Sequence, residues 1–539
     1  MGHSHATGLG YCALGTLFVA LGCSASNRSN FDGGGAGAGV GTGGAGGLIF
    51  TGNGGAGGDV LIGDPKTCEQ AAQAKTYIGC DFWPTVVPNQ VWSIFDFAVV
   101  VANAGDDVAS VTIERNGGTV ASGQVQPDSL ATFYLPWVAA LKGPDFDMYT
   151  SVAPFSASAL VTGGAYHLTS SIPVTVYQFN ALEYGPQGGP PNKDWSSCPG
   201  YLSGVGCNSY SNDASLLLPS TAMTGNFRVT GIAGWPLAGL GAYFAVTGLT
   251  DGTGVTVHMP ATGSVVSGAG ISAIGAGQNG SFTLDRGDVA VLLGDPSGDQ
   301  SGAQVYASQP VQVLHGHPCR FVPDDYQACD HLEESVLPAE TLGKHYLVTR
   351  PTGPSGGPVT HVVRLYGNFD GTVLTYPQGA PPGAPPALAA GQVVDLGMVD
   401  MDFEVTSDQA FAVSSFLVAG EVIGAGDPAQ SAAVAVEQFR SKYVFLAPYD
   451  YDQNFAQIVM PSGAGVVLDG VSVGGAVAIG GSGYSVAHVL LGPGVNGAHV
   501  LQSNSAIGLQ VTGYGSYTSY YYPGGLDLRA IAPPPPPPQ

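Results

Sequence analysis

The chain has 539 residues, too many for one ordinary hydrophobic core, so its length predicts several domains. Asp and Glu number 39 against 15 Lys and Arg, which gives a formal net charge of -24. A surface of this sign repels the phosphates of nucleic acids and of anionic lipids, so neither is expected as a direct partner. Hydrophobic residues make up 44% of the chain, enough to bury several cores.

The chain opens with an apolar run of the length of an export signal, from Ala6 to Cys23. We expect residues 1–22 to be a signal peptide. The sequence ALGCS around Cys23 resembles the lipobox of bacterial lipoproteins, in which a Cys is lipidated and becomes the new N-terminus. Cys23 is therefore the predicted lipidation site, with plain cleaved secretion and a retained anchor as alternatives. The predicted location is the cell envelope, as an outer-membrane lipoprotein, or outside the cell.

Two segments of biased composition flank the predicted body. Residues 23–63 are rich in Gly, which leaves too few side chains for a core, and we expect a flexible tether that spans roughly 30 Å as a random coil. Residues 524–539 end in a run of Pro and are expected to form a Pro-rich tail of polyproline II conformation.

Six cysteines remain besides Cys12 and Cys23, and they fall into three close pairs. In an exported protein, an even number of closely spaced cysteines indicates disulfides. Each such bond would stabilise its short loop by about 2 to 3 kcal/mol. Sequence alone does not fix the connectivity, but neighbours are the favoured partners: Cys68 with Cys80, Cys198 with Cys207, and Cys319 with Cys329.

The third pair lies in the most polar stretch of the chain, residues 319–343. This stretch and the residues before it offer candidate zinc ligands, but their spacing matches no Cys-x-x-Cys or His-x-x-x-His pattern. We favour a disulfide-pinned linker, and we predict no metal and no cofactor. The zinc alternative would use His315, His317, Cys319, Cys329 and His331.

Short alternating runs rich in Val, Thr and Tyr, bounded by Gly, Asp or Pro, recur from Trp92 to Tyr522 and predict an all-β body. Three segments repeat one pattern, in which an apolar run and a turn precede an aromatic residue that leads into a strand. The equivalent aromatic residues are Phe227, Tyr346 and Tyr443. Units of about 100 residues with several short strands favour tandem β-sandwich-like repeats, with a β-propeller as the alternative.

The repeats and the cysteine pairs together predict the domain boundaries. Each predicted linker encloses one cysteine pair and lies just before a repeat opening. We expect disulfide-pinned linkers at 186–211 and 319–331, and β units at 64–185, 212–318, 332–424 and 425–523.

Four stretches resemble the N-terminal domain family of IgG Fc-binding proteins, in a bacterial branch. They are VWSIFDFAVVVANAGDDVASVTI, SNDASLLLPSTAMTGNFRV, YASQPVQVLHGHPC and CDHLEESVLPAETLGKHYLV, and the resemblance covers about Cys68 to Tyr514. It implies export, a β-rich adhesive body and surface interaction, and bacterial members are frequently lipoproteins. The most distinctive motif carries Asp330, His331, Glu334, Pro338, Gly343 and Tyr346.

Two properties of this family are not carried over to the chain. The Gly-Asp-Pro sequences at 294–296 and 426–428 lack the following His of the family's self-cleavage motif, so autoproteolysis is not implied. Immunoglobulin binding is not carried over either, because the family's name comes from animal proteins.

Catalytic patterns are weak in this sequence. Ser355 in GPSGG fits Gly-x-Ser-x-Gly, but it follows a Pro in an expected loop rather than at a strand-to-helix turn. Glu333 and Glu334, beside Asp330 and His331, are the candidates for a carboxylate pair, although a structural role at the start of a repeat is favoured. We therefore predict a protein that is not an enzyme, with an exported hydrolase of polysaccharide or peptide as the alternative.

A cluster of aromatic residues near the C-terminus suggests a binding surface. Tyr side chains can stack on sugar rings, but alternating Tyr also fills the core of an ordinary strand, and core packing is favoured. The expected partner is an extracellular glycan or protein, bound by an adhesion module. The residues in question are Tyr514, Tyr517, Tyr520, Tyr521 and Tyr522.

Overall fold

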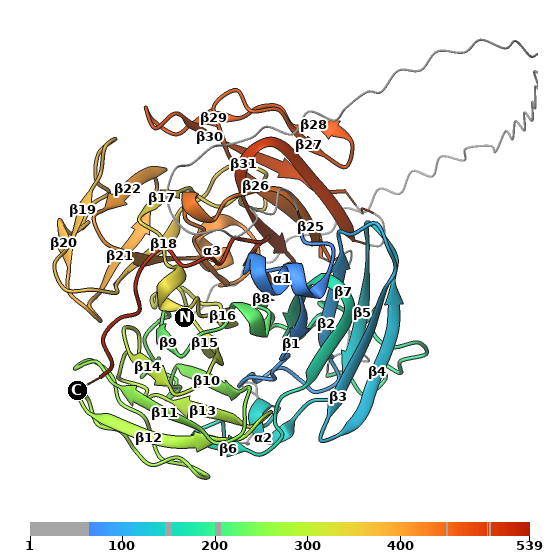
Figure 1. Ribbon diagram of the computed structural model, residues 1–539, viewed down its shortest axis with the longest axis vertical. Coiled ribbons are helices and arrows are strands. Elements are labelled where there is room, and N and C mark those ends of the chain that lie inside the picture. The colour runs from blue at the N-terminus through green and yellow to red at the C-terminus, as the bar shows by residue number, and fades with distance from the viewer. Residues whose placement is uncertain are drawn as a thin grey trace, which may run out of the picture. The chain divides into compact units, whose positions relative to one another are not determined.

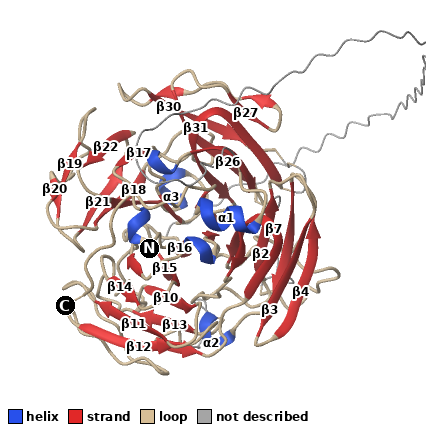
Figure 2. Ribbon diagram, viewed as in Figure 1, coloured by secondary structure: helices blue, strands red, loops and turns tan. Residues whose placement is uncertain are grey.

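The computed structural model describes residues 64–145, 153–199, 206–448, 451–492, 494 and 497–538. The predicted signal peptide, the tether and Cys23 lie outside these residues. Strands dominate the described part (Figure 2). None of its helices is long and apolar enough to cross a membrane. They are α1 (Cys68–Ala74), α2 (Ala139–Lys142), α3 (Gly420–Ile423) and the 3-10 helices η1 (Ser220–Ala222), η2 (Ala339–Thr341) and η3 (Val436–Gln438).

The strands form four blades that follow one another in chain order around a common centre (Figure 1). Every blade has a central-strand sheet, whose innermost strand lies at that centre. From the centre outward, these sheets are β8 (Ala214–Leu217), β7 (His167–Phe179), β2 (Phe97–Asn103) and β5 (Ser129–Leu135) in blade 1; β16 (Asp330–Ser335), β15 (Val311–Arg320), β10 (Tyr243–Gly248), β13 (Val289–Leu293) and β6 (Ala159–Val161) in blade 2; β24 (Gln430–Ala432), β23 (Phe411–Phe416), β18 (His361–Gly367) and β21 (Val393–Val399) in blade 3; and β32 (Ser519–Pro523), β31 (Ala498–Tyr514), β26 (Gln453–Pro461), β30 (Tyr484–Leu490) and β29 (Val477–Ala478) in blade 4.

Every blade also has a companion sheet. In blades 1 and 4 the long strands β7 and β31 run through both sheets of the blade, so their sheets are joined. The companion sheets are β1 (Gly79–Phe82), β7, β3 (Ala109–Arg115) and β4 (Gly118–Val125); β9 (Asn226–Arg228), β14 (Gln304–Ala307), β11 (Thr253–His258) and β12 (Asn279–Leu284); β17 (His345–Val348), β22 (Phe403–Ser407), β19 (Thr372–Thr375) and β20 (Ala387–Leu388); and β25 (Arg440–Leu446), β31, β27 (Val466–Leu468) and β28 (Val471–Ser472).

The pattern of burial explains why these segments form strands. In β3 the buried residues Ala109, Val111 and Ile113 alternate with more exposed ones, as expected for a sheet with one face on the core. The central strand β8 is buried at every residue, and three of its four residues, Ala214, Leu216 and Leu217, are apolar. A turn at Asp251-Gly252 joins β10 to β11, and Gly252 has the positive φ of 69° that Gly adopts readily.

Each central strand pairs with one blade before the chain continues into the next. β8 pairs with β7 of blade 1, while β16 and β24 pair with β15 and β23 of blades 2 and 3. The last central strand, β32, pairs with β31 of blade 4 and contacts β8, which closes the ring. The two ends of the described body also meet, because the Tyr77 N–H donates to the Leu526 carbonyl at 3.1 Å.

The all-β prediction is confirmed, and both proposed arrangements describe part of it. Within blade 3 the two sheets enclose one shared hydrophobic core, as in a sandwich; it includes Tyr346, Val363, Leu365, Phe403 and Phe411. The four blades together form the propeller-like ring of the alternative. The equivalent residues Phe227, Tyr346 and Tyr443 lie on β9, β17 and β25, each just after a 3-10 helix.

Three disulfides join the local cysteine pairs. Cys319 lies near the end of β15 and Cys329 directly precedes β16, so this bond closes the loop between two paired strands. The bond between Cys198 and Cys207 lies in the connection between β7 and β8. The bond between Cys68 and Cys80 links α1 to β1.

Candidate functional site

The centre of the ring is organised by one carboxylate, that of Asp213. It directly precedes β8, and its side chain is fully buried. Its Oδ1 accepts the backbone N–H groups of Ala214 at 2.9 Å and Tyr521 at 3.2 Å, and its Oδ2 accepts those of Glu333 at 3.2 Å and Gln430 at 3.0 Å. These donors come from all four central strands. Asp213 therefore satisfies backbone donors that converge where no sheet ladder can serve them.

A second buried carboxylate, that of Asp330, connects the beginnings of two central strands. Its Oδ1 accepts the Asn212 N–H at 2.6 Å, just before β8. Its Oδ2 accepts the Thr518 hydroxyl at 2.6 Å and the Ser519 N–H at 3.3 Å, at the start of β32. Asp330 itself opens β16, so one side chain links three of the four central strands.

The two glutamates that follow on β16 are also used inside the fold. Glu334 accepts the Ser335 N–H at 2.8 Å and the Ala432 N–H of β24 at 3.2 Å. Glu333 accepts the Asn180 amide, and one of its oxygens lies 3.3 Å from the His331 Nε2. All of these groups lie inside the protein, with no more than 2% exposure for either glutamate.

Burial has a clear electrostatic consequence for three of these acids. Desolvation raises the pKa of Asp213, Asp330 and Glu334 well above the usual range of a carboxyl group, while their backbone donors act in the opposite direction. Perturbed carboxyl groups can mark a catalytic site, but structural networks perturb them too. Here the acids hold backbone groups of neighbouring strands, which indicates a structural role.

The remaining family-motif residues also serve the architecture. Pro338 forms an isolated bridge with Phe227 of the preceding repeat. A Cβ on Gly343 would lie 2.1 Å from the Cβ of Ala435, so a side chain there would collide with the next repeat. The Tyr346 hydroxyl accepts the Gly343 N–H at 3.1 Å and donates to the Phe411 carbonyl at 2.7 Å. Pro338 and Gly343 therefore form junctions between repeats, and Tyr346 makes hydrogen bonds within one repeat.

The candidate zinc ligands do not assemble into a site. Among the described residues, no three His, Cys, Asp or Glu side chains are placed to hold a metal ion. Cys319 and Cys329 are joined to each other, and His317 Nδ1 accepts the N–H of Cys319. Ser355, the candidate nucleophile, lies exposed in a turn between β17 and β18.

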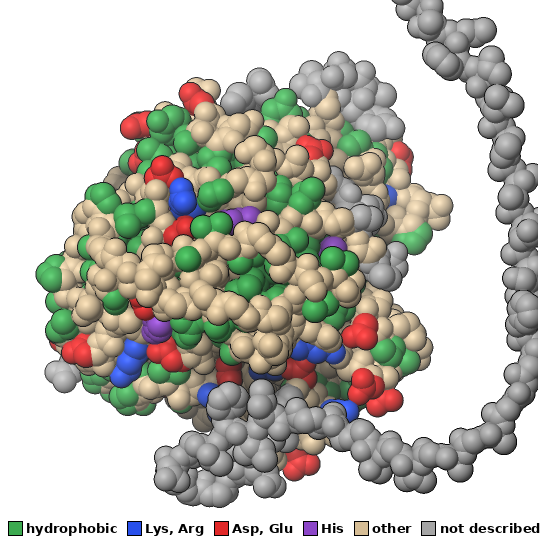
Figure 3. Space-filling model, turned by 90° about the horizontal axis from the view of Figure 1, so that it is seen from above, with side chains coloured by type: hydrophobic (Ala, Val, Ile, Leu, Met, Phe, Trp, Pro, Cys, Tyr) green, Lys and Arg blue, Asp and Glu red, His purple; other side chains and the backbone are tan. Residues whose placement is uncertain are grey.

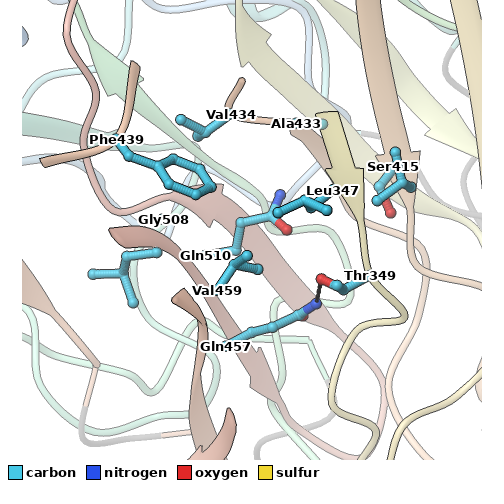
Figure 4. A pocket seen from close by; sticks show the side chains of 12 residues that line it. Leu347, Thr349, Ser415, Ala433, Val434, Phe439, Gln457, Val459, Gly508 and Gln510 are labelled. Atoms are coloured by element: carbon cyan, nitrogen blue, oxygen red, sulfur yellow. Dashed lines mark hydrogen bonds between the residues drawn. The ribbon is translucent and has the colours of Figure 1, made fainter. Parts of the chain in front are cut away.

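A narrow cleft lies between blades 3 and 4 (Figure 4). Leu347 and Phe439 are among its apolar lining residues, and Figure 4 shows the Gln457 amide directed at the Thr349 hydroxyl, to which it donates. The Gln457 Oε1 is buried without a protein partner. The free space is about the size of one water molecule, which is too small for a ligand pocket.

The C-terminal tyrosines divide into a buried group and one exposed residue. Tyr514, Tyr520, Tyr521 and Tyr522 are at most 1% exposed, and Tyr522 packs against Tyr177 with ring centroids 4.9 Å apart. Tyr517 differs, because it is 52% exposed in the turn between β31 and β32. Its ring centroid lies 5.4 Å from that of Tyr210, which is 37% exposed.

Sequence reasoning missed both Asp213 and Tyr210. A signal for Asp213 was present, since an Asp stands at or just before the openings of β8, β16 and β24: Asp213, Asp330 and Asp427. Tyr210 carried no comparable signal. Its partner Tyr517 is 307 positions away in the sequence, and the two residues become neighbours only when the ring closes.

Two comparisons with known proteins bear on this arrangement. A family model described as IgGFc binding protein matches residues 213–513, from the central carboxylate almost to the end of β31. The human IgGFc-binding protein is 33% identical over 145 residues, which cover 24% of this chain. The aligned part spans only 2% of the length of that human protein.

Proposed function

Because the chain belongs to the IgGFc-binding protein family, we propose that its four-bladed body is an extracellular module that binds its ligand by surface contact, without catalysis. The observation that carries this proposal is the position of the motif acids. Asp330 and Glu334 are buried and accept hydrogen bonds from backbone groups of other central strands. Groups used in this way maintain the fold, which leaves ligand recognition to the outer surface.

The low proportion of charged residues supports a binding face made mostly of uncharged groups. Only 10% of the residues in the chain are charged. Figure 3 shows a face on which charged side chains are few and scattered among hydrophobic and uncharged polar groups. An extracellular glycan or protein is the ligand class that such a surface suits, and the human relative's name records binding to IgG Fc for that protein alone.

The disulfides and the N-terminal sequence support a location outside the cytoplasm. Three disulfides are typical of a protein that matures in an oxidising compartment. We propose that Cys23 is lipidated and that residues 23–63 tether the body to the cell envelope as an outer-membrane lipoprotein. Metabolic labelling with a fatty-acid probe tests the anchor: the wild type should be labelled and Cys23→Ser should not. An unlabelled wild type would contradict lipidation and leave secretion.

The binding function is tested with the purified chain on surfaces coated with glycans, with mucin glycoprotein and with IgG Fc. Saturable binding to one of these surfaces, without turnover of the bound material, is the expected result. Turnover that disappears in Glu334→Gln, while thermal melting shows that the variant is folded, would instead support the hydrolase alternative. An exposed control, Glu421→Gln, separates a specific effect from the loss of one negative charge, since Glu421 lies at the surface in α3.

A further inference from the structure

The pair formed by Tyr210 and Tyr517 is a surface feature that the fold does not need for its core. The two rings are tilted by 51° with centroids 5.4 Å apart, and both keep a large exposed fraction. The neighbouring tyrosines Tyr184 and Tyr451 are at least 92% buried and pack against each other at 5.8 Å. An aromatic pair that remains at the surface above buried tyrosines offers apolar faces to a ligand.

Both tyrosines lie next to residues that are bonded to the ring. Tyr210 lies between Cys207, which is disulfide-bonded, and Asn212, whose N–H binds the Asp330 carboxylate. Tyr517 directly precedes Thr518, whose hydroxyl binds the other oxygen of the same carboxylate. Asp330 therefore fixes the backbone beside each ring. A recognition surface placed on such supports loses little conformational entropy when it binds.

Polar side chains lie beside each tyrosine of the pair. The Asn208 amide donates to the Tyr210 hydroxyl at 3.2 Å. Next to Tyr517 in the chain, the Ser516 hydroxyl lies 3.5 Å from Oδ2 of Asp452, and both of these residues are exposed. Aromatic faces bordered by an amide, a hydroxyl and a carboxylate match a pyranose ring, which has an apolar C–H face and hydroxyl groups at its rim.

We propose that Tyr210 and Tyr517 form a carbohydrate-binding platform that stacks on the apolar face of a neutral sugar, with Asp452 and Asn208 binding its hydroxyl groups. The carboxylate of Asp452 and the acidic net charge of -24 disfavour sialylated and other anionic sugars. This inference rests on the proposed function and names the ligand class and the surface that it would use.

The test is a glycan array that carries neutral, amino and sialylated oligosaccharides, probed with the full chain, followed by titration of the best neutral oligosaccharide. We expect binding to neutral glycans, with sialylated versions weaker. Tyr517→Ala should weaken the affinity about tenfold because it removes one stacking face, whereas Tyr517→Phe should stay within about twofold because it keeps that face. Tyr306→Ala is the matched control, since Tyr306 is 36% exposed on β14 in blade 2.

Two results would overturn the inference. One is a wild type that binds no glycan on the array, and the other is glycan binding that survives Tyr517→Ala and Tyr210→Ala while thermal melting shows that both variants are folded. If the wild type binds a protein surface but no glycan, the platform is rejected and the proposed binding function stands. If it binds no surface at all and turns over a substrate, both are rejected.

Discussion

The Asp330 carboxylate accepts the Thr518 hydroxyl at 2.6 Å, although the two residues are 188 positions apart in the chain. Asp330 opens the central strand of blade 2, and Thr518 directly precedes the strand that completes blade 4. This contact therefore joins opposite sides of the ring. It also gives the family motif a physical meaning, because the motif acid secures the closing strand rather than a ligand.

The central carboxylate should be the most sensitive acidic position for folding. Asp213→Asn replaces one oxygen by an amide NH₂ that would face backbone N–H donors, so at least two buried donors lose their acceptor. We expect the free energy of unfolding to fall by about 2 to 4 kcal/mol. Urea denaturation measures this loss.

An exposed aspartate provides the control for that variant. Asp295 accepts the Ser297 N–H at 2.8 Å in a surface turn, and its replacement by Asn keeps an oxygen for this bond. Asp295→Asn should change the stability by no more than about 0.5 kcal/mol. Equal effects of the two substitutions would show that Asp213 has no special place in the ring.

Close packing between repeats makes a second prediction. A methyl group at Gly343 would lie 2.1 Å from the Cβ of Ala435, so Gly343→Ala forces two repeats apart and should cost about 1 to 3 kcal/mol. Gly357 is the matched control, because a Cβ there meets no atom within 4 Å. Thermal melting of both variants decides the matter, and a Gly343→Ala protein as stable as Gly357→Ala would contradict the packing.

Local features of this fold could be predicted from sequence, and features that depend on ring closure could not. The cysteine pairs are separated by 9 to 12 positions, so their pairing needs only short loops. The aromatic residues Phe227, Tyr346 and Tyr443 revealed the repeat because each follows the same local turn. By contrast, β8 pairs with blade 1 although the repeat pattern groups it with blade 2. No local periodicity in the sequence indicates that β8 pairs with the preceding blade.

The candidate site shows the same division. The acidic motif on β16 was visible in sequence, and its structural role was the favoured interpretation. The convergence of four backbone donors on Asp213 was not visible, because the donors lie up to 308 positions from it. The tyrosine cluster was ambiguous for a related reason. Only the position of β32 against β31 decides that Tyr520 faces the core while Tyr517 remains exposed.

The bridging tyrosine of the repeat gives a third prediction. The Tyr346 hydroxyl accepts one backbone N–H and donates to one carbonyl, and the equivalent Tyr443 hydroxyl accepts the Arg440 N–H at 3.0 Å. Blade 2 carries Phe227 at this place, so the ring itself is tolerated without the hydroxyl. Tyr346→Phe and Tyr443→Phe should each cost about 1 kcal/mol by urea denaturation. A loss above about 3 kcal/mol would point to a role beyond these bonds.

The disulfides give a fourth prediction. Digestion without reduction should release three linked peptide pairs, with Cys319 joined to Cys329 and no free thiol at either position. Replacing both of these residues by Ala should lower the free energy of unfolding by about 2 to 3 kcal/mol, since the bond closes a short loop. Free thiols together with a stoichiometric metal would contradict the disulfide and restore the zinc alternative.

The last prediction concerns the pH dependence of stability, through Asp427. Burial raises the pKa of this side chain to about 8, and the acid lies close enough to Asp330 for the two charges to oppose each other. In the unfolded chain the pKa of an Asp side chain is about 3.9. The folded state therefore holds this proton more tightly. The contribution of Asp427 to stability is complete below about pH 4, declines as the pH rises, and is lost once the pH passes about 8.

Comparing the wild type with Asp427→Asn measures this contribution together with its coupling to Asp330, while the titrating groups that do not interact with Asp427 stay the same. Among these are His315 and His361, whose pKa values burial lowers to about 3 and which act in the opposite direction, destabilising the fold as the pH falls below about 6.5. We expect the stability of the wild type relative to Asp427→Asn to decrease steadily from pH 5 to pH 8 and to level off above that. Urea denaturation at each pH gives the difference. A constant difference across this range would mean that Asp427 titrates alike in the folded and unfolded states, and would contradict the raised pKa.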